Sequence, residues 1–431
     1  MKLIPLALLL LLLSVNVATA AQIGVNGGAM WASGTYRSIS DDAEFRTLAA
    51  NGMKRYRTTV PLAADTDPWV ATRFATVLAS ANRSGVKLEP VLALPLMWGD
   101  KTDAGRYPAG DAAAIYAQGY NRTLSFVSQF ASQVNDWELG NELNLTVQDA
   151  SGAPLFGRGW TADEFAAYPS MTDYANLLRG MSDAIDQINA SQGLNLRRIV
   201  GTTSTMFGYI DFMRSRGVKV DVIGYHYYEH TGVDPTNYWG GVRPPFNLFT
   251  KLGSYGVPAA VNEMNCGEIY DASFANTATS PSMATCNSNL RAMLDTFGRQ
   301  PAIEWIDAYE LLDEAEKAAP GNRFGLMFQL DAPKPLLATI AAAAGVPPSV
   351  TFPDTLVVIA NRQPMHLAPT VVGPATDLRC TGVLLPVGLT INSSTCEISG
   401  TPIYTTVPTY VTSTIIVSAT NQVDVVSFEI N

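Results

Sequence analysis

Short apolar or β-branched runs alternate with longer segments of helical character from Gln22 to about Gly345. This alternation predicts βα units and a parallel sheet. The predicted strands are residues 23–26, 54–60, 88–94, 136–141, 198–203, 220–228, 259–263 and 303–310. The clearest predicted helices are residues 111–133, 172–190, 282–297 and 335–344. Eight strands, each followed by a helical segment, predict an α/β fold of the (β/α)8 barrel type.

A doubly wound open sheet is the rival arrangement for the same alternation. If such a sheet bound nucleotides, it would need a glycine-rich phosphate loop after a strand. The run Gly24-Val25-Asn26-Gly27-Gly28 does not make that fingerprint. The barrel is therefore the favoured prediction.

The pattern changes at a short linker predicted at residues 346–350. Beyond it, residues 351–431 are rich in Thr, Val, Ile, Ser and Pro, and they show turn signals without a helical period. Such a segment predicts a small all-β sandwich. The expected organisation is a barrel domain at residues 21–345 and a sandwich domain at residues 351–431.

The N-terminus reads as a secretory signal. One lysine precedes an apolar run at residues 6–13, and Ala18-Thr19-Ala20 suits signal peptidase. Cleavage near Ala20 predicts a secreted or periplasmic protein. The apolar run is shorter than the roughly 20 residues that span a bilayer, and no later segment is long and apolar enough.

Composition narrows the classes of partner. Charged residues make up 15% of the chain and hydrophobic residues 47%, which is material for a folded core. The net charge of −10 argues against nucleic acid, whose phosphates attract basic surfaces. It also disfavours an anionic polymer as substrate.

The 4 cysteines suit two disulfides in an exported protein, with three connectivities open. Neighbours in sequence are the favoured partners, namely Cys266 with Cys286 and Cys380 with Cys396. Free thiols are the alternative. Zinc binding has less support, because no two cysteines have zinc-finger spacing and the 3 histidines are not clustered with them.

Candidate chemistry lies in two Asn-Glu pairs near predicted strand ends. They occur in WELGNELN, which contains Glu142, and in AVNEMNC, which contains Glu263. Active sites of (β/α)8 barrels form at the C-terminal ends of the strands. Glycosidic bond cleavage uses one carboxyl group as proton donor and a second as nucleophile or base. Glu142 and Glu263 are therefore the candidate catalytic residues.

These motifs resemble those of the large clan of retaining glycoside hydrolases built on (β/α)8 barrels. The resemblance implies that Glu142 is the acid/base on the fourth strand and Glu263 the nucleophile on the seventh. It also implies that Asn141 bonds the sugar 2-hydroxyl. Leu143 departs from the clan, in which many members have proline at this position. Strand alternation places Glu138 on the same face as Glu142, where a buried structural acid bonded to arginine is the favoured interpretation.

The sixth predicted strand adds His226 and Tyr228 on one face. This His-x-Tyr pattern resembles the clan's sixth-strand motif, which implies that Tyr228 bonds the nucleophile and His226 contacts sugar. Arg57 resembles the clan's arginine that keeps the nucleophile ionised, and Arg55, on the same face, is the competing choice.

Flat aromatic side chains are expected to bind the apolar faces of sugar rings. Trp98 and Tyr309 are the favoured candidates, with Trp305 and Trp31 less favoured. The segment 309–314, continuing to residues 324–326, resembles the end of the barrel in glycoside hydrolase family 39. Residues 385–402 and 415–421 resemble the bacterial immunoglobulin-like domain appended to secreted enzymes and surface proteins. That family usually has glycine where this chain has Cys396.

The resemblance implies hydrolysis of a β-linked poly- or oligosaccharide by double displacement, without a metal or cofactor. One alternative is a non-catalytic carbohydrate-binding or surface protein that attaches through its C-terminal domain. Another is a barrel hydrolase in which Glu229 or Glu268 replaces Glu263 as nucleophile. A serine esterase has no support, because the chain contains no Gly-x-Ser-x-Gly motif.

Overall fold

The computed structural model describes most of the chain. The described residues are 21–31, 33–62, 68–94, 97, 111–147, 158–229, 234–238, 244–346, 349–352, 356–372, 378–417 and 422–431. The predicted signal segment and Trp98 lie outside them.

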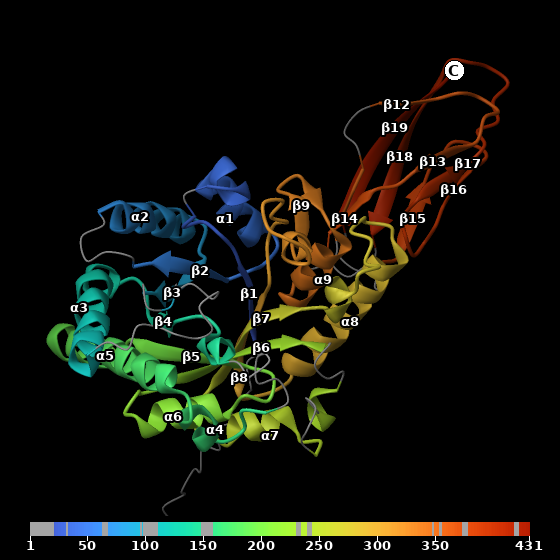
Figure 1. Cartoon of the computed structure of the whole chain (residues 1–431). Helices are drawn as coiled ribbons and strands as arrows, with labels where there is room; N and C mark the ends of the chain where they lie inside the picture. Colours follow the sequence, from blue (N-terminus) through green and yellow to red (C-terminus); the bar gives the residue numbers. More distant parts are fainter. Residues whose placement is uncertain are drawn as a thin grey trace, which may run out of the picture.

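Eight parallel strands close into a barrel in chain order, which confirms the predicted (β/α)8 fold and excludes the open sheet (Figure 1). The strands are β1 (Gln22–Asn26), β2 (Arg55–Pro61), β3 (Lys87–Ala93), β4 (Asp136–Leu139), β5 (Arg197–Thr203), β6 (Val222–Tyr228), β7 (Ala259–Asn265) and β8 (Ile303–Ala308). Each predicted strand overlaps one of them.

Helices surround the barrel (Figure 1). They are α1 (Asp41–Ala50), α2 (Pro68–Arg83), α3 (Ala112–Phe130), α4 (Ala162–Ala166), α5 (Pro169–Gln192), α6 (Gly208–Ser215), α7 (Leu248–Gly253), α8 (Pro281–Phe297) and α9 (Pro335–Ala343). Local sequence explains their starts, since Ser40, Asp111 and Ser280 each accept a hydrogen bond from a backbone N–H in the first turn.

Two short connections matter for the site described below. The 3-10 helices η3 (Leu143–Thr146) and η6 (Gly267–Tyr270) follow β4 and β7 at the C-terminal mouth of the barrel. A hairpin of β9 (Met327–Gln329) and β10 (Ala332–Pro333) precedes α9.

Glycine allows the closest helix contact around the barrel. A Cβ at Gly119 of α3 would lie 2.2 Å from the carbonyl oxygen of Leu177, and one at Gly180 of α5 would lie 2.2 Å from that of Tyr116. Real Cβ atoms do not approach backbone so closely. The two glycines therefore let α3 and α5 pack backbone to backbone.

Alternation along β4 separates the apolar shell from the polar barrel interior. Trp137 is buried and packs against Phe126 and Phe74, with ring centroids 6.2 and 6.3 Å away. The next side chain, Glu138, bonds Arg57. The barrel thus buries apolar side chains against its helices and keeps charged ones inside.

The predicted C-terminal ends of three strands, β4, β7 and β8, are wrong by two residues. β8 ends at Ala308 rather than at Glu310. β4 ends at Leu139 rather than at Asn141, because Gly140 turns the chain with φ +83° and Glu142 follows with φ +46°. β7 continues beyond Glu263 to Asn265, whose side-chain amide donates to the carbonyl oxygens of Phe324, at 2.8 Å, and Tyr309. Glu142 thus lies in a turn and Glu263 within a strand.

The C-terminal region is all-β, as predicted. One sheet has the order β12-β19-β18-β15, another has the order β13-β17-β16, and β11 pairs with β14. The strands are β11 (Ser349–Thr351), β12 (Val357–Ile359), β13 (Met365–Leu367), β14 (Thr370–Val372), β15 (Cys380–Val383), β16 (Leu389–Ile391), β17 (Ile398–Gly400), β18 (Thr409–Val417) and β19 (Gln422–Ile430). Their buried side chains form a core separate from that of the barrel.

Both predicted disulfides are present, Cys266–Cys286 in the barrel and Cys380–Cys396 in the C-terminal domain. Cys396 has φ +60°, in the left-handed region that favours glycine. This backbone conformation explains why glycine is the usual residue at a position that here carries a disulfide.

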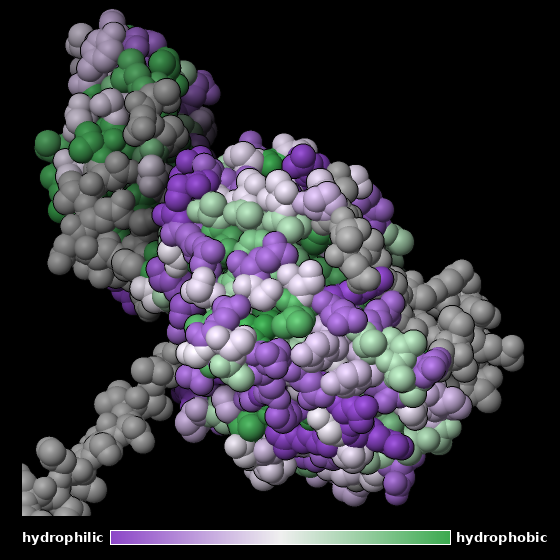
Figure 2. Space-filling view, turned by 90° about the vertical axis from the view of Figure 1, so that its left-hand side faces the viewer, coloured by the Kyte–Doolittle hydropathy of each residue, from purple (hydrophilic) through white to green (hydrophobic). Residues whose placement is uncertain are grey.

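Large hydrophobic side chains are exposed mainly on the C-terminal domain, where Figure 2 shows them in green. Among the described residues of the barrel, this class contains only Trp69 and Tyr270. Within the described parts of the chain, no helix combines the length and apolar character needed to cross a membrane.

Replacing both Cys266 and Cys286 by serine should lower the free energy of unfolding of the barrel by about 3 kcal/mol, because the bridge closes a loop of about 20 residues in the unfolded chain. All 7 tryptophans precede residue 340, so fluorescence in a guanidinium titration reports the barrel. The matched Cys380→Ser, Cys396→Ser variant should leave the fluorescence transition in place. Equal shifts for both variants would contradict local stabilisation by each bridge.

Candidate active site

Glu142 and Glu263 come together at the mouth of the barrel, with His226 between them. His226 Nδ1 lies 3.0 Å from Glu142 Oε1 and 3.2 Å from Glu263 Oε2. A carboxylate oxygen of Glu142 lies within 4.8 Å of one of Glu263. The two Asn-Glu motifs, far apart in sequence, thus supply one pair of carboxylates.

Glu263 is held inside the barrel by three neighbours. Arg57 donates to its Oε1 at 2.8 Å, and the Tyr228 hydroxyl donates to its Oε2 at 3.2 Å, beside His226. The side chain of Glu263 is 8% exposed. Its position on β7, paired in register with His226 of β6, keeps the carboxylate in one place.

Glu142 is held differently, by a turn. Gly140 has φ +83°, a backbone conformation that favours glycine, and a Cβ there would also lie 2.8 Å from the end of the Leu143 side chain. The carbonyl oxygen of Glu142 accepts from Leu145 N at 2.8 Å as η3 begins. The side chain of Glu142 is 30% exposed, so the two carboxylates differ in their access to water.

Arg57 connects the strands around Glu263. Its Nε and Nη2 donate to Glu138 at 2.6 and 2.9 Å, its Nη1 donates to Asn26 and Glu263, and its Nη2 also donates to Asn141. Every guanidinium N–H therefore has an acceptor. Glu138 is the buried acid bonded to arginine that the sequence favoured.

Arg55, the competing arginine, lies one layer deeper in the barrel. It pairs with Glu89 at 2.6 Å and Asp136 at 3.0 Å, and it lies 3.8 Å above the ring of Trp305. Because side chains two residues apart on β2 share a face, both arginines point inward, but Arg57 lies two residues further toward the C-terminal mouth of the barrel.

The charges at the mouth of the barrel shift two pKa values strongly. Burial alone would lower the pKa of His226, but the negative charge of Glu263 and hydrogen bonds to Glu142 and Glu263 raise it to about 9. Burial raises the pKa of Glu263, but the positive charges of His226 and Arg57 outweigh it and lower the value to about 2. At neutral pH, a protonated His226 therefore lies beside an ionised Glu263.

A cavity of about 560 Å³ opens beside Glu263. Asn141 and Glu263 border it, and Trp31 and Tyr309 supply aromatic walls. Trp305 is buried beneath Arg55, so it is not one of these walls. Trp98, a favoured candidate from the sequence, lies outside the described residues.

The sequence did not single out several residues of this cavity. Lys317 and Glu310 line it, with Lys317 Nζ 3.1 Å from the Tyr309 hydroxyl and 3.3 Å from Glu310 Oε1. Lys317 also pairs with Glu314. Glu310 directly follows Tyr309, which was a usable signal, whereas Lys317 lies in a loop with no motif.

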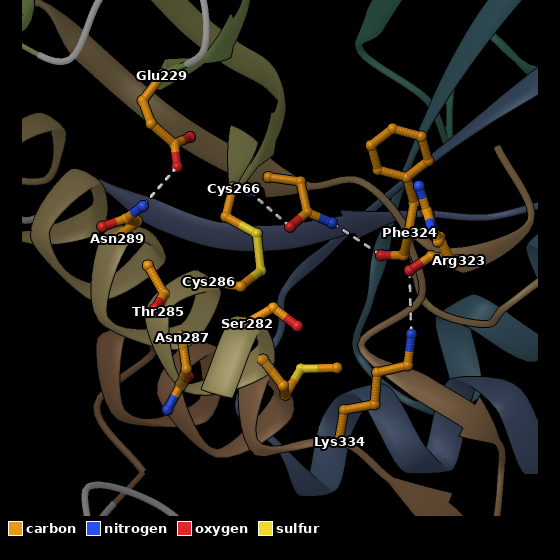
Figure 3. The surroundings of a disulfide bond; sticks show 12 residues. Glu229, Cys266, Ser282, Thr285, Cys286, Asn287, Asn289, Arg323, Phe324 and Lys334 are labelled. Atoms are coloured by element: carbon orange, nitrogen blue, oxygen red, sulfur yellow. Dashed lines mark hydrogen bonds between the residues drawn. A yellow bond between two sulfur atoms is a disulfide. The ribbon is translucent and has the colours of Figure 1, made fainter. Parts of the chain in front are cut away.

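The alternative nucleophiles lie elsewhere. Glu229 Oε1 accepts from Asn289 of α8 at 3.0 Å, near the Cys266–Cys286 disulfide (Figure 3). Burial raises the pKa of Glu229. Neither Glu229 nor Glu268 is in the group of Glu142, His226 and Glu263, the one compact set of potential metal ligands in the described residues.

The chain combines a (β/α)8 barrel with a C-terminal immunoglobulin-like domain. Residues 340–431 match the family model named "Putative Ig domain", which confirms the expected C-terminal domain. The match begins inside α9. No curated protein matches the chain in sequence.

Solved structures of similar fold are glycoside hydrolases by name. The family 1 β-glucosidase from Thermotoga maritima has a TM-score of 0.51 and 12% identity, covering 76% of this chain and 97% of its own. A family 39 glycoside hydrolase from Bacteroides cellulosilyticus WH2 has a TM-score of 0.49 and 14% identity, and the match covers 89% of this chain and 79% of that hydrolase. The endo-β-1,4-mannanase from Thermotoga petrophila has a TM-score of 0.48 and 13% identity, and the match covers 96% of this chain and 98% of the mannanase. At these identities, the likeness is one of fold.

The shift of His226 predicts a pH dependence of stability. Its pKa is raised from about 6.5 in an unfolded chain to about 9, so its contribution of about 3 kcal/mol is complete below pH 6.5 and is lost as the pH rises to 9. The free energy of unfolding, measured in guanidinium at pH 6 to 9.5, should fall through this window. In His226→Gln the fall should be smaller by about this amount, and a fall of equal size would contradict the assignment. Part of the fall should remain, because burial raises the pKa of Glu44 to about 8 and that of Glu89 to about 7, so both also lose protons in this window.

Proposed function

We propose that this protein is a secreted glycoside hydrolase that cleaves O-glycosidic bonds of a β-linked poly- or oligosaccharide by double displacement. The supporting observation is the pair of Glu142 and Glu263, with carboxylate oxygens within 4.8 Å at the mouth of a barrel and with Glu263 beside a cavity. The fold shared with the Thermotoga maritima β-glucosidase agrees with this proposal.

The separation of the carboxylates favours retention over inversion. Retaining enzymes hold their two carboxyl groups about 5 to 5.5 Å apart, whereas inverting enzymes hold them about 6.5 to 9.5 Å apart to admit water. The closest oxygens of the two carboxylates lie within 4.8 Å of each other, which is nearer to the shorter range than to the longer one.

Glu263 is the proposed nucleophile. Arg57 and His226 keep it ionised, and it needs a negative charge to attack the anomeric carbon. Burial limits hydration of this carboxylate, and the hydrogen bond from Tyr228 orients it. As the glycosyl-enzyme forms, Glu263 becomes a neutral ester, and Glu142 becomes negatively charged because it gives its proton to the leaving oxygen.

Glu142 is the proposed acid/base. It is more exposed than Glu263, so the leaving group and the attacking water can both reach it. In the first step it protonates the leaving oxygen, and in the second it takes a proton from the attacking water. His226 contacts both carboxylates, so its positive charge can stabilise whichever of the two is ionised in each step.

The remaining residues are proposed to bind the sugar in the cavity. Asn141 is oriented by its bond from Arg57 Nη2 at 2.6 Å, and its amide N–H groups are proposed to donate to the sugar 2-hydroxyl. Trp31 and Tyr309 are proposed aromatic walls for the ring. Two disulfides suit the proposed location outside the cytoplasm, and the C-terminal domain is proposed to contact polymer or cell surface.

Replacing either carboxyl group should abolish most turnover. Glu142→Gln should lower kcat by about 10²- to 10⁴-fold, because it removes general acid–base catalysis. Glu263→Gln should lower it at least as much, since no covalent intermediate can form. Azide added to Glu142→Ala should restore turnover and give the β-glycosyl azide, which NMR identifies.

Two controls accompany these variants. Glu229→Gln removes the alternative nucleophile and should keep most activity. Binding of oligosaccharide to Glu142→Gln and Glu263→Gln, measured by calorimetry, separates loss of chemistry from loss of the site. A non-catalytic binding protein would show binding in all variants and turnover in none, including the wild type.

The product of the first turnover should keep the β configuration. A panel of aryl β-glucoside, β-xyloside, β-mannoside and β-galactoside, with the matching β-linked oligosaccharides, identifies a substrate. Proton NMR within the first minutes, before mutarotation, then gives the anomer. Initial release of the α-anomer from a β-linked substrate would contradict the retaining mechanism.

A further inference from the structure

Tyr270 is exposed at the mouth of the barrel, although most large hydrophobic side chains of the barrel are buried. Among the described residues of the barrel, this class of exposed side chain contains only Tyr270, 44% exposed, and Trp69 of α2, 39% exposed. Tyr270 ends η6, which begins directly after Cys266. The disulfide ties that cysteine to α8, and Figure 3 shows the bridge between the two segments.

The ring of Tyr270 is connected to the proposed nucleophile by direct contacts. It meets the ring of Tyr228 at 5.8 Å and that of Phe324 at 5.6 Å, with interplanar angles of 89° and 70°. Tyr228 in turn bonds Glu263. Burial, and then the charges of Glu142 and Glu263, raise the pKa of Tyr270, which agrees with a place near both carboxylates.

The proposed sugar-binding cavity is lined by other residues. Its described lining comes from β1, β2 and β3, from the segments after β1, β3, β4 and β8, and from Glu263 of β7. That described lining includes none of Glu142, Tyr228 or Tyr270. Glu263 thus borders the cavity, whereas Glu142 and Tyr270 are not among its described walls.

The different positions of Glu263 and Glu142 indicate where the two parts of a substrate lie, the ring that becomes covalently bound and the leaving group. The nucleophile must touch the anomeric carbon, so the ring that becomes covalently bound occupies the cavity. The acid/base must reach the leaving oxygen, so the leaving group lies on the side of Glu142. Tyr270 is the exposed aromatic ring on that side.

We propose that Tyr270 is the platform on which the leaving-group ring rests, and that the natural leaving group is a sugar residue rather than a small alkyl group. This inference rests on the proposed hydrolase function. A flat aromatic ring offers a large apolar face at a low cost in conformational entropy, and the C–H face of a sugar ring complements it. η6 and the disulfide fix the segment that carries the platform, and Tyr228 and Phe324 support its ring.

Binding energy at this position should be used in the transition state. If the leaving ring is held in place while Glu142 protonates its oxygen, losing the platform lowers kcat/KM for substrates that have such a ring. A substrate whose leaving group is one fluorine atom cannot use the platform. The ratio of the two values of kcat/KM therefore isolates the role of Tyr270.

The test compares the β-linked disaccharide and the β-glycosyl fluoride of the sugar that the wild type cleaves in the panel above. Tyr270→Ala should lower kcat/KM for the disaccharide by about tenfold and leave that for the fluoride unchanged. Tyr270→Trp should restore the disaccharide value. Tyr410→Ala removes an exposed aromatic side chain of the C-terminal domain and should change neither value.

Three results would overturn the inference. Equal losses on disaccharide and fluoride in Tyr270→Ala would show that the residue only supports Tyr228 and Glu263. An unchanged disaccharide value would show that the leaving ring does not use Tyr270. If the wild type cleaves nothing in the panel, the proposed function falls, and the platform falls with it.

Discussion

The buried guanidinium of Arg57 is the interaction on which the barrel interior and its mouth both depend. It joins Asn26 of β1, Glu138 of β4, Asn141 after β4 and Glu263 of β7. Burying charges is costly, and the cost is offset only when each charge is paired and each donor has an acceptor. The contacts that satisfy Arg57 are therefore the same contacts that position the proposed nucleophile and keep it ionised.

The two carboxylates owe their different proposed roles to the backbone that carries them. Glu263 lies within β7, is nearly buried and has fixed partners, which suits a group that must stay charged. Glu142 lies in the turn created by Gly140 and is partly exposed, which suits a group that exchanges a proton. His226 contacts both, so a change in charge on one carboxylate affects the other through a single imidazolium.

Much of the site could be predicted because a (β/α)8 barrel directs the ends of its strands to one place. Alternation on β6 placed His226 and Tyr228 on one face, and both contact the carboxylates. The same reasoning could not choose between Arg55 and Arg57, since both point inward. It also gave no reason to notice Tyr270 or Lys317, because loop residues follow no period and their approach to the site depends on loop conformation.

The sequence by itself determined the strand count and order, the C-terminal domain and the two candidate carboxylates, and it favoured one pairing of the cysteines. These features follow from local periodicity, composition and spacing, which are properties of neighbouring residues. Only the tertiary structure decided that Glu142 and Glu263 lie within 4.8 Å, that Arg57 rather than Arg55 reaches Glu263, and that an exposed aromatic ring lies near both carboxylates. The physical reason is closure of the barrel, because the distance between distant strand ends is set by the register of all eight strands together.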